Sequence, residues 1–444
     1  MKRAGVILAA GLGTRMKSVL PKVMHPVAGR PILGHVIASM RAAGVERIVV
    51  VTHAEGDAMR AYAASLGAES TIQKEQLGTG HAALCARAAL ADFEGDVVVS
   101  YGDMPLIAPA TFDGAFAGRA RAGMAMVGFR PDDPAHYGRM IVDSGGLLER
   151  IVEFKDANQA ERAVDLCNAG ILAADAPSFF RWAKALKNEN AQSEYYLTDI
   201  PAIAKSEGVR CAVVLADAAE MMGVNSRAEL AQAEAAMQSR LRMRALDAGA
   251  GMVAPETVHL SYDTVLEPDC AVEPYVVFGP GVAVRAGARI RAHSHVEGAE
   301  IRAGAIAGPF ARLRPGAVLE ENVHIGNFVE VKNTRVEKGA KANHLAYLGD
   351  ARVGQGANIG AGTITCNYDG FDKHATDIGA GAFIGSNTAL VAPVTVGRGA
   401  IVGAGSTITK DVEADSLSVA RAEQRGIKGW AEKFRRRKKS EGKA

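Results

Sequence analysis

Apolar residues in the first half of the chain gather in short runs that are separated by longer amphipathic segments. Such runs lie at residues 4–10, 47–51, 96–101 and 124–129, and helical patterns fill segments such as 32–43 and 79–91. Short buried strands that alternate with helices are typical of a mostly parallel sheet covered by helices. Residues 1–226 are therefore predicted to form an α/β domain with a Rossmann-like sheet.

The pattern changes at residue 227, where strong helix formers replace the apolar runs. Residues 227–248 are rich in Ala, Leu, Glu, Gln and Arg, which favour a helix. Ser226 is placed to cap the start of this helix, and Gly249 is placed to end it. The segment is predicted to be a helix that connects two domains.

A six-residue period of apolar positions runs through residues 249–444, and Gly follows several of these positions directly. An inward-pointing apolar residue with a small residue at the corner, repeated every six residues, is typical of a parallel β-helix. A disordered Gly-rich segment, the alternative, would not keep such a period. The period is carried by Phe278, Val284, Ile290, Val296, Leu313, Leu319, Ile325, Val331, Ile378, Ile384, Leu390, Val396, Val402 and Ile408.

Two segments of this region depart from the repeat. Residues 365–376 do not match the hexad pattern and are predicted to leave the coil as a loop, and such loops often carry function. Residues 433–443 are strongly basic. We interpret them as a solvated, flexible terminus in preference to a site for an anionic partner.

Composition and charge narrow the class of protein. The chain has 444 residues, 48% of them hydrophobic and 23% charged, which predicts a globular protein of more than one domain. The formal net charge of +2 gives no general reason to expect nucleic acid or a membrane as partner. The apolar N-terminus is interrupted by Gly11, Gly13 and Arg15, so it predicts no signal peptide. Five cysteines fit free thiols in a reducing cytoplasm, where we expect the protein.

A glycine-rich turn follows the first predicted strand. Residues 8–16 read Leu-Ala-Ala-Gly-Leu-Gly-Thr-Arg-Met, and residues 20–22 read Leu-Pro-Lys. Backbone N–H groups of such a turn can approach phosphate oxygens closely. The two cations Arg15 and Lys22 suit a polyphosphate whose leaving group gains charge. The turn lacks the third Gly of a dinucleotide fingerprint and the Lys-Ser/Thr of a Walker A loop.

This turn resembles the signature of sugar-phosphate nucleotidyltransferases, and further matches lie at residues 101–106 and 223–225. With the hexad repeat, nearly the whole chain is similar to the bifunctional N-acetylglucosamine-1-phosphate uridylyltransferase/glucosamine-1-phosphate N-acetyltransferase family. The resemblance implies a left-handed β-helix. It also implies acetylation of glucosamine-1-phosphate by acetyl-CoA, then coupling with UTP to give UDP-N-acetylglucosamine and pyrophosphate. This product would supply peptidoglycan and lipopolysaccharide synthesis.

The resemblance also assigns residues to the uridylyl site. Asp103 and Asn225 would bind Mg²⁺, for which one carboxylate and one amide oxygen suffice because the ion keeps several waters. Both residues are also common in ordinary turns. The sugar phosphate would attack UTP while Mg²⁺, Lys22 and Arg15 neutralise phosphate charge. Gly138, Glu153 and Asn168 would contact the N-acetylglucosamine, and Asn225 would lie beside the metal. The other residues in contact with the nucleotide sugar would be Leu8, Ala9, Ala10, Gly11, Lys22, Gln73, Gly78, Thr79, Tyr101, Gly102 and Asp103.

Polar residues occur in the hexad region where a purely structural solenoid does not need them. Transfer of an acetyl group to a sugar amine requires a base, commonly His, and cations for the sugar phosphate. The resemblance makes His344 the base, and Glu330 is a candidate to orient it. The amino sugar phosphate would contact Arg314, Lys332, Tyr347 and Asn358, and acetyl-CoA would contact Ala361, Asn367, Tyr368, Ser386, Ala404 and Arg421.

We expect a homotrimer with the acetyl sites between subunits. The flat outer sides of a hexad solenoid can pack together, and the matched residues are spread from Arg314 to Arg421. Two other functions stay open at this point. In one, the β-helix only drives oligomerisation of a nucleotidyltransferase, although His344 and Tyr347 argue against that. In the other, the chain binds a nucleotide sugar without turnover, although Asp103 argues against that.

Overall fold

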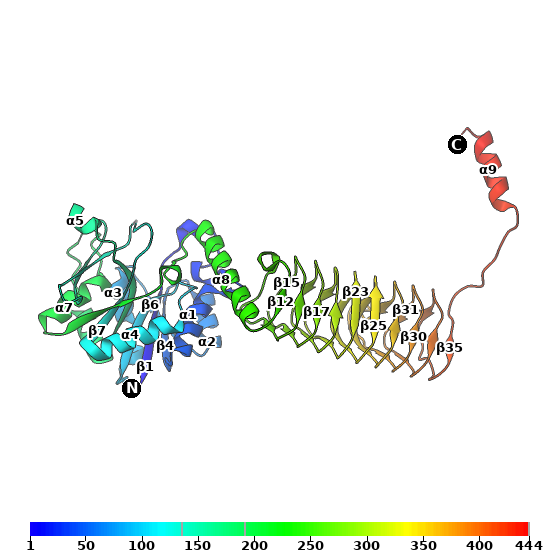
Figure 1. Cartoon of the computed structure of the whole chain (residues 1–444), viewed down its shortest axis with the longest axis horizontal. Coiled ribbons are helices and arrows are strands. Elements are labelled where there is room, and N and C mark those ends of the chain that lie inside the picture. Colours follow the sequence, from blue (N-terminus) through cyan, green and yellow to red (C-terminus); the bar gives the residue numbers. More distant parts are fainter. Residues whose placement is uncertain (135, 191, 443–444) are drawn as a thin grey trace. The chain divides into compact units, whose positions relative to one another are not determined.

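The computed structural model of the chain describes residues 1–134, 136–190 and 192–442 (Figure 1). The backbone separates into two compact units, Met1–Leu241 and Arg242–Ala444. The division falls inside helix α8 (Arg227–Asp247), which occupies the segment predicted to connect two domains. Lys443, the last residue of the predicted basic tail, lies outside the described residues.

The first unit is built on a nine-stranded sheet whose central strands β4, β1 and β6 are parallel. The class predicted from the sequence, a mostly parallel α/β sheet, is confirmed. Strand β10 is an exception, because it runs antiparallel to both β6 and β7. The strands are β1 (Arg3–Ala9), β4 (Arg47–His53), β5 (Glu69–Gln73), β6 (Asp96–Tyr101), β7 (Gly123–Phe129), β8 (Arg139–Val142), β9 (Leu148–Val152), β10 (Cys167–Asp175) and β11 (Arg210–Leu215).

Helices cover both faces of this sheet, because successive residues of its central strands are apolar and point to opposite sides. Ile7 packs in the core beneath α1, α2 and α4, whereas Val6 and Leu8 pack beneath α3, α6 and α7. These helices are α1 (Ile32–Ala42), α2 (Asp57–Ser65), α3 (Thr79–Cys85), α4 (Pro109–Ala122), α6 (Ala176–Lys184) and α7 (Ile200–Ser206), and a short α5 (Gln159–Arg162) follows β9.

The helix predicted at residues 79–91 is two elements in the structure. Helix α3 ends at Cys85, and a 3₁₀ turn follows at Ala88–Leu90. The backbone tightens to bonds between residues three apart, such as Arg87 N–H to Leu84 O (3.0 Å), as is common at helix ends. The predicted segment was therefore right in place but too long as one helix.

Helix α8 begins with a reciprocal cap that also fixes the residue before it. The backbone N–H of Glu229 donates to the hydroxyl of Ser226 (3.3 Å), as the prediction of an N-cap requires. The carboxylate of Glu229 in turn accepts the backbone N–H of Asn225 (2.7 Å). The arrangement resembles a capping box, but the N–H that Glu229 binds belongs to the residue before the cap. At the other end, Gly249 adopts a φ of 95°, a conformation that ends a helix readily.

The second unit is a parallel β-helix of the hexapeptide-repeat class, with three faces. All fourteen apolar residues of the predicted hexads point inward and are at most 4% exposed, which confirms the hexad prediction. One face contains β12 (Gly251–Met252), β14 (Ala271–Val272), β17 (Arg289–Ile290), β20 (Ile306–Ala307), β23 (His324–Asn327), β25 (Lys341–His344), β27 (Asn358–Ile359), β30 (Phe383–Ile384), β33 (Ile401–Val402) and β35 (Leu417–Ser418).

The other two faces join where the long strands β24 (Glu330–Val336) and β26 (Tyr347–Val353) turn a corner and pair on both sides. The second face contains β15 (Val277–Phe278), β18 (His295–Val296), β21 (Arg312–Leu313), β28 (Ile364–Cys366), β31 (Ala389–Val391) and β34 (Thr407–Ile408). The third contains β13 (Val265–Leu266), β16 (Ala283–Val284), β19 (Ala299–Ile301), β22 (Ala317–Leu319), β29 (Thr376–Ile378) and β32 (Val394–Val396).

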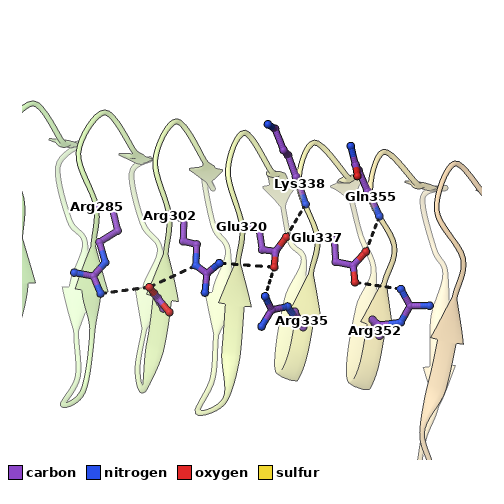
Figure 2. A network of polar contacts seen from close by, with 9 residues as sticks. Arg285, Arg302, Glu320, Arg335, Glu337, Lys338, Arg352 and Gln355 are labelled. Atoms are coloured by element: carbon purple, nitrogen blue, oxygen red, sulfur yellow. Dashed lines mark hydrogen bonds and ion pairs between the residues drawn. The ribbon is translucent and has the colours of Figure 1, made fainter.

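Charged side chains tie successive coils together on the outside of the β-helix (Figure 2). One carboxylate oxygen of Glu337 accepts the backbone N–H of Gln355 in the next coil (3.0 Å), and the other accepts from Arg352 (3.1 Å). Glu320 repeats the pattern one coil earlier, where it accepts the N–H of Lys338 (3.1 Å). These glutamates satisfy turn N–H groups that the strands leave unpaired.

The loop predicted at residues 365–376 is shorter in the structure. Thr365 is fully buried in β28, where its hydroxyl accepts the N–H of Gly349 (2.7 Å) and donates to the carbonyl of Gly349 (3.1 Å). A Thr whose hydroxyl is satisfied by neighbouring backbone can take an inward position. Thr376 likewise belongs to β29. Residues 367–375 therefore form the loop, and the prediction that residues 365, 366 and 376 leave the coil is wrong.

The described part of the basic tail is exposed, as expected, but it forms helix α9 (Trp430–Ser440) rather than an irregular segment. Pairs spaced by four residues account for the helix. The rings of Trp430 and Phe434 stack at 5.1 Å, and Arg436 donates to Glu432 (2.6 Å). Within the described part of the chain, none of the helices has both the length and the apolar character that crossing a bilayer requires.

Candidate active sites

A cleft of about 240 Å³ opens at the carboxyl ends of β1, β5 and β6 in the first unit. Ligands commonly bind at this edge of an α/β sheet. The cleft gathers most residues that the sequence predicts for the nucleotide, together with Val23, Gln76, Ala82 and Glu194, to which the sequence assigned no role. The predicted residues in its lining are Leu8, Ala9, Ala10, Gly11, Lys22, Gln73, Gly78, Thr79, Tyr101 and Asp103.

Hydrogen bonds fix the shape of this cleft. Gln73 is buried, and its amide donates to the carbonyl of Gly78 (3.1 Å). The hydroxyl of Thr79 accepts the backbone N–H of Leu197 (3.0 Å). Leu197, to which the sequence assigned no role, therefore helps to hold one wall of the cleft.

The glycine-rich turn packs closely against Lys22. Gly13 has a φ of 61°, and a β-carbon there would lie 2.7 Å from Cβ of Lys22. Only glycine allows both the conformation and the close approach. The turn is also anchored from α8, because the guanidinium of Arg227 donates to the carbonyl of Met16 (3.3 Å).

The ammonium of Lys22 lies between the two residues predicted to bind a metal. Its Nζ is 2.5 Å from Oδ2 of Asp103 and 2.9 Å from Oδ1 of Asn225. The backbones of the latter two are coupled, because the N–H of Val224 donates to the carbonyl of Asp103 (2.9 Å). Two hard oxygens therefore converge on one positive charge.

This pair of oxygens fits Mg²⁺, which prefers carboxylate and amide oxygens and keeps several waters. The described residues contain no group of three or more His, Cys, Asp or Glu side chains that could hold a metal ion. A Mg²⁺ ion at Asp103 and Asn225 would therefore take its other ligands from water and phosphate, as is usual for this ion.

Arg15 is exposed in the short 3₁₀ turn Thr14–Met16. Its guanidinium forms no hydrogen bond or ion pair with any residue that the structure describes. The structure therefore leaves the charge of Arg15 uncompensated at the mouth of the glycine-rich turn.

Three residues predicted to hold the sugar lie together. The backbone N–H of Asn168 donates to the carbonyl of Gly138 (2.9 Å), and a β-carbon on Gly138 would lie 3.4 Å from a carboxylate oxygen of Glu153. The hydroxyl of Thr198 donates to Glu153 (3.0 Å). Burial raises the pKa of Glu153 above its ordinary value, which the hydrogen bond from Thr198 partly offsets.

Tyr101 lies near Glu153 of this group and near Asp103, whose charges both act on its hydroxyl. Burial raises the pKa of its hydroxyl, and the negative charges of Glu153 and Asp103 act in the same direction. The ring packs against Gly170, whose φ is 71° and where a β-carbon would lie 2.0 Å from the ring. Tyr101 therefore keeps its proton and stays fixed beside the sugar residues.

In the second unit, His344 and several residues predicted for acetyl-CoA follow one edge of the β-helix. Strand pairing sets Lys341 opposite Asn358, Asn358 opposite Phe383 and Phe383 opposite Ile401. Three positions after each of these paired residues lies a residue predicted for the acetyl site, so each coil contributes one such residue to this edge. At its end, the guanidinium of Arg421 donates to the carbonyl of Ala404 (2.5 Å). In order, the edge contains His344, Ala361, Ser386, Ala404 and Arg421.

His344 is exposed, and its ring is held by Asn327, one coil earlier. Nδ1 of His344 lies 2.8 Å from Oδ1 of Asn327. Glu330, the residue considered for this role, instead accepts from Arg314 (2.9 Å). Asn327 was not among the residues predicted from the sequence. Its spacing of 17 residues from His344, about one coil, indicates that the two residues are neighbours.

The residues predicted for the amino sugar phosphate lie on the strands beside this edge. Arg314 and Lys332 follow Leu313 and Val331, which are paired in register on adjacent coils. Tyr347 is paired with Glu330, and Asn358 begins β27. Arg314 and Lys332 place two cationic groups on adjacent coils, a pattern that suits a phosphate, and Glu330 pairs with Arg314 in the structure.

The loop at 367–375 is tied back to the coil. Asn367 is 7% exposed, and its amide donates to the carboxylate of Asp350. Tyr368 is exposed, and its hydroxyl donates to the carbonyl of Gly370 within the loop (2.6 Å). The structure therefore fixes Asn367 in place and leaves the ring of Tyr368 facing solvent.

An exposed stripe runs along one corner of the β-helix and reaches the residue after His344. Its members adopt left-handed backbone conformations at successive corners. The rings of Tyr275, His293, Phe310 and Phe328 stack with centroids 4.9–5.2 Å apart. The corner stripe consists of Tyr275, His293, Phe310, Phe328 and Leu345, all exposed.

Comparison with known proteins agrees with the two units of the fold. The MobA-like NTP transferase domain family matches residues 5–170, and the bacterial transferase hexapeptide family (six repeats) matches residues 375–410. The chain is 53% identical to the bifunctional protein GlmU of Paramagnetospirillum magneticum, over 98% of this chain and 97% of the relative. It is 54% identical to that of Sphingopyxis alaskensis, over 97% and 96%. With two sites on two units and this similarity along its length, the chain belongs to the family of bifunctional GlmU proteins.

Proposed function

We propose that the chain makes UDP-N-acetylglucosamine in two steps, at one site in each unit. The second unit acetylates glucosamine-1-phosphate with acetyl-CoA. The first unit then couples N-acetylglucosamine-1-phosphate with UTP and releases pyrophosphate. The observation that carries this proposal is the presence, in one chain, of a cleft lined by Lys22 and Asp103 and of an exposed His344 held by Asn327.

In the uridylyl step, an oxygen of the sugar phosphate attacks the α-phosphorus of UTP, and the bond to the β-phosphate oxygen breaks. No side-chain nucleophile is needed, because the attacking phosphate is already ionised. Lys22 and the unpaired Arg15 neutralise the phosphates as charge moves to the leaving pyrophosphate. A Mg²⁺ ion held by Asp103 and Asn225 would supply further positive charge there.

The remaining residues of this site select the substrates. Gln73, Gly78 and Thr79 hold the uridine through the hydrogen-bonded wall of the cleft. Glu153 and Asn168, beside Gly138, hold the N-acetylglucosamine. Polar groups fixed in this way favour a ligand that pairs with them, because an analogue that lacks the partner leaves them unsatisfied.

In the acetyl step, His344 acts as the base. Oδ1 of Asn327 can only accept a hydrogen bond, so Nδ1 of His344 carries the hydrogen and the lone pair of Nε2 is available. The sugar amine attacks the thioester carbonyl and passes a proton to Nε2. The tetrahedral intermediate then collapses, the C–S bond breaks, and the coenzyme A thiolate takes the proton back.

Acetyl-CoA lies along the edge that runs from His344 to Arg421. This edge crosses four coil-to-coil steps of about 4.8 Å each, so its length of about 19 Å suits the extended pantetheine arm of coenzyme A. Ala361 and Ala404 offer only backbone groups and close approach. Arg421, at the far end, carries the positive charge that the phosphates of coenzyme A require.

We also propose that the chain forms a homotrimer through its β-helix. The exposed corner stripe supports this, because a solvated row of stacked aromatic rings marks an interaction surface. The stripe ends beside His344, which favours acetyl sites completed by a neighbouring copy. The five free cysteines fit the reducing cytoplasm, from which the product would supply peptidoglycan and lipopolysaccharide synthesis.

The proposal is tested by incubating the purified chain with glucosamine-1-phosphate, acetyl-CoA, UTP and Mg²⁺ and following the products by mass spectrometry. N-acetylglucosamine-1-phosphate should appear first and UDP-N-acetylglucosamine second. A parallel reaction supplies N-acetylglucosamine-1-phosphate and omits acetyl-CoA. A chain that makes the nucleotide sugar only in this parallel reaction has the uridylyl activity alone. A chain that makes neither N-acetylglucosamine-1-phosphate nor the nucleotide sugar contradicts the proposal.

A further inference from the structure

We propose that Lys22 competes with the divalent cation for Asp103 and Asn225, so that the metal binds well only when a nucleotide draws Lys22 away. The inference rests on the uridylyl function proposed above. It concerns the order in which charges enter the site, and it makes Lys22 an internal substitute for the metal before the substrate arrives.

The geometry that supports this is the position of the Lys22 ammonium. Nζ lies within hydrogen-bond distance of both proposed ligands, at 2.5 Å from Asp103 and 2.9 Å from Asn225. A cation bound by these same two oxygens would have to occupy the same space. The side chains of Lys22 and Asp103 are only 13% and 19% exposed, so solvent screens their interaction weakly.

The parts of the site differ in their freedom to move. Asn225 is fixed by the cap of α8, where its N–H donates to Glu229 (2.7 Å). Its neighbour Val224 is bonded to the backbone of Asp103 (2.9 Å). Lys22, by contrast, ends in a flexible four-carbon stem. The ligand pair is therefore preformed, and the lysine is the element that can move.

The ammonium of Lys22 has a second position available to it, at the glycine-rich turn. Its backbone is held against Gly13 of the phosphate-binding turn, and its side chain lines the same cleft as Gly11. A bound triphosphate offers the ammonium several charged oxygens there. When Lys22 moves to them, it frees Asp103 and Asn225 for the metal that the same phosphates help to coordinate.

This exchange keeps Asp103 paired in both states. A carboxylate that is only 19% exposed is costly to leave without a counter-ion, and Lys22 removes that cost while the cleft contains no ligand. It also disfavours binding of free metal ions. The site therefore discriminates in favour of a metal–nucleotide complex over the metal alone.

The test measures binding of Mn²⁺ to the full-length chain without nucleotide, by electron paramagnetic resonance of the free ion. Lys22→Met should bind Mn²⁺ at least about tenfold more tightly than the wild type, because an adjacent opposite charge shifts ion binding at a carboxylate by one to three orders of magnitude, roughly as it shifts proton binding. Lys17→Met is the matched control. It removes the same charge from the same loop, and it should leave Mn²⁺ affinity unchanged.

A second pair of variants assigns the gain to this site. Asp103→Asn added to Lys22→Met should abolish the gain. Lys22→Gln, which keeps a donor for Asp103 but has no charge, should show the same gain as Lys22→Met and serves if that variant does not fold. The proposal is overturned if both folded Lys22 variants bind Mn²⁺ no better than the wild type, or if the gain survives Asp103→Asn.

The outcome is separable from that of the proposed function. Wild-type uridylyl transfer is assayed independently with UTP and N-acetylglucosamine-1-phosphate. Turnover by the wild type without tighter Mn²⁺ binding in the Lys22 variants rejects only the competition. Absence of turnover in the wild type rejects the uridylyl function, whereas the Mn²⁺ measurement still reports on the competition.

Discussion

His344 and Asn327 lie opposite each other on adjacent coils of the β-helix, with Nδ1 of the imidazole 2.8 Å from Oδ1 of the amide. The hydrogen bond fixes the tautomer of His344 and the direction in which Nε2 points. Strand register creates this contact, because residues 17 positions apart are paired between β23 and β25. The proposed base and its proposed positioning residue are thus brought together by the repeat itself.

We predict that Asn327→Leu lowers acetyl transfer by about tenfold to a hundredfold, mainly through kcat, because the base is misoriented while the substrate contacts remain. Asn327→Asp keeps an acceptor for Nδ1–H and should retain most of the activity. Steady-state kinetics of acetyl transfer separates kcat from KM. Equal activity of the Leu and wild-type forms would mean that Asn327 does not position the base.

The raised pKa of Glu153 leads to a prediction about pH. In the proposed function the carboxylate accepts hydrogen bonds from the sugar. KM for N-acetylglucosamine-1-phosphate should therefore rise, by about tenfold, as pH falls through the raised pKa of Glu153. This rise should begin at a higher pH than an ordinary glutamate would give. Glu153→Gln should remove that pH dependence, and an unchanged profile in the variant would exclude Glu153 as its source.

The same pKa shift predicts an effect on stability with a definite sign. The folded chain holds the proton of Glu153 more tightly than the unfolded chain, so the stability contributed by this group falls as pH rises from the unfolded to the folded pKa. Glu153→Gln should therefore raise the melting temperature at neutral pH, and the gain should vanish in acid. Thermal unfolding at both pH values checks this, and a larger gain in acid would reverse the assignment.

We predict that the first unit works alone if helix α8 is kept to residue 241. Ala233, Met237 and Leu241 are buried, and Glu234 accepts the backbone N–H of Ala28 (2.6 Å). Uridylyl transfer by a fragment of residues 1–241 should match that of the whole chain. A fragment of residues 1–227, cut one residue beyond the domain boundary predicted from the sequence, loses these contacts and should melt at a lower temperature. A folded but inactive 1–241 fragment would show that the site needs the β-helix.

The hexads and the glycine-rich turn were readable from the sequence because each depends on local pattern. A single apolar residue such as Phe278 or Ile384 does not indicate a β-helix. The recurrence of such residues every six positions does. Contacts between coils were not readable in this way. Asn327, the Glu337–Arg352 tie and the burial of Thr365 depend on which residues register brings together, and polar residues at those positions look like ordinary surface or loop.

The first site shows the same division. The order of motifs pointed to Lys22, Asp103 and Asn225 as members of one site, and the structure brings all three together. The position of the ammonium between the two oxygens could not be predicted from the sequence, because it depends on the folded structure. The start of α8 packs beside the segment that contains Lys22, although the two are about 200 positions apart in the sequence. The contact between His25 and Arg227, which are 202 positions apart, shows this packing.

The claim of two independent activities is tested most directly by mixing two variants, each defective in one step. Asp103→Ala should lose uridylyl transfer and keep acetyl transfer. His344→Ala should lose acetyl transfer by about a hundredfold to ten-thousandfold and keep uridylyl transfer. Neither variant alone should convert glucosamine-1-phosphate, acetyl-CoA and UTP into UDP-N-acetylglucosamine at an appreciable rate. The mixture should do so at a rate near that of the wild type, because the acetylated intermediate diffuses between them. A mixture as inactive as its parts, with both variants folded, would contradict the account.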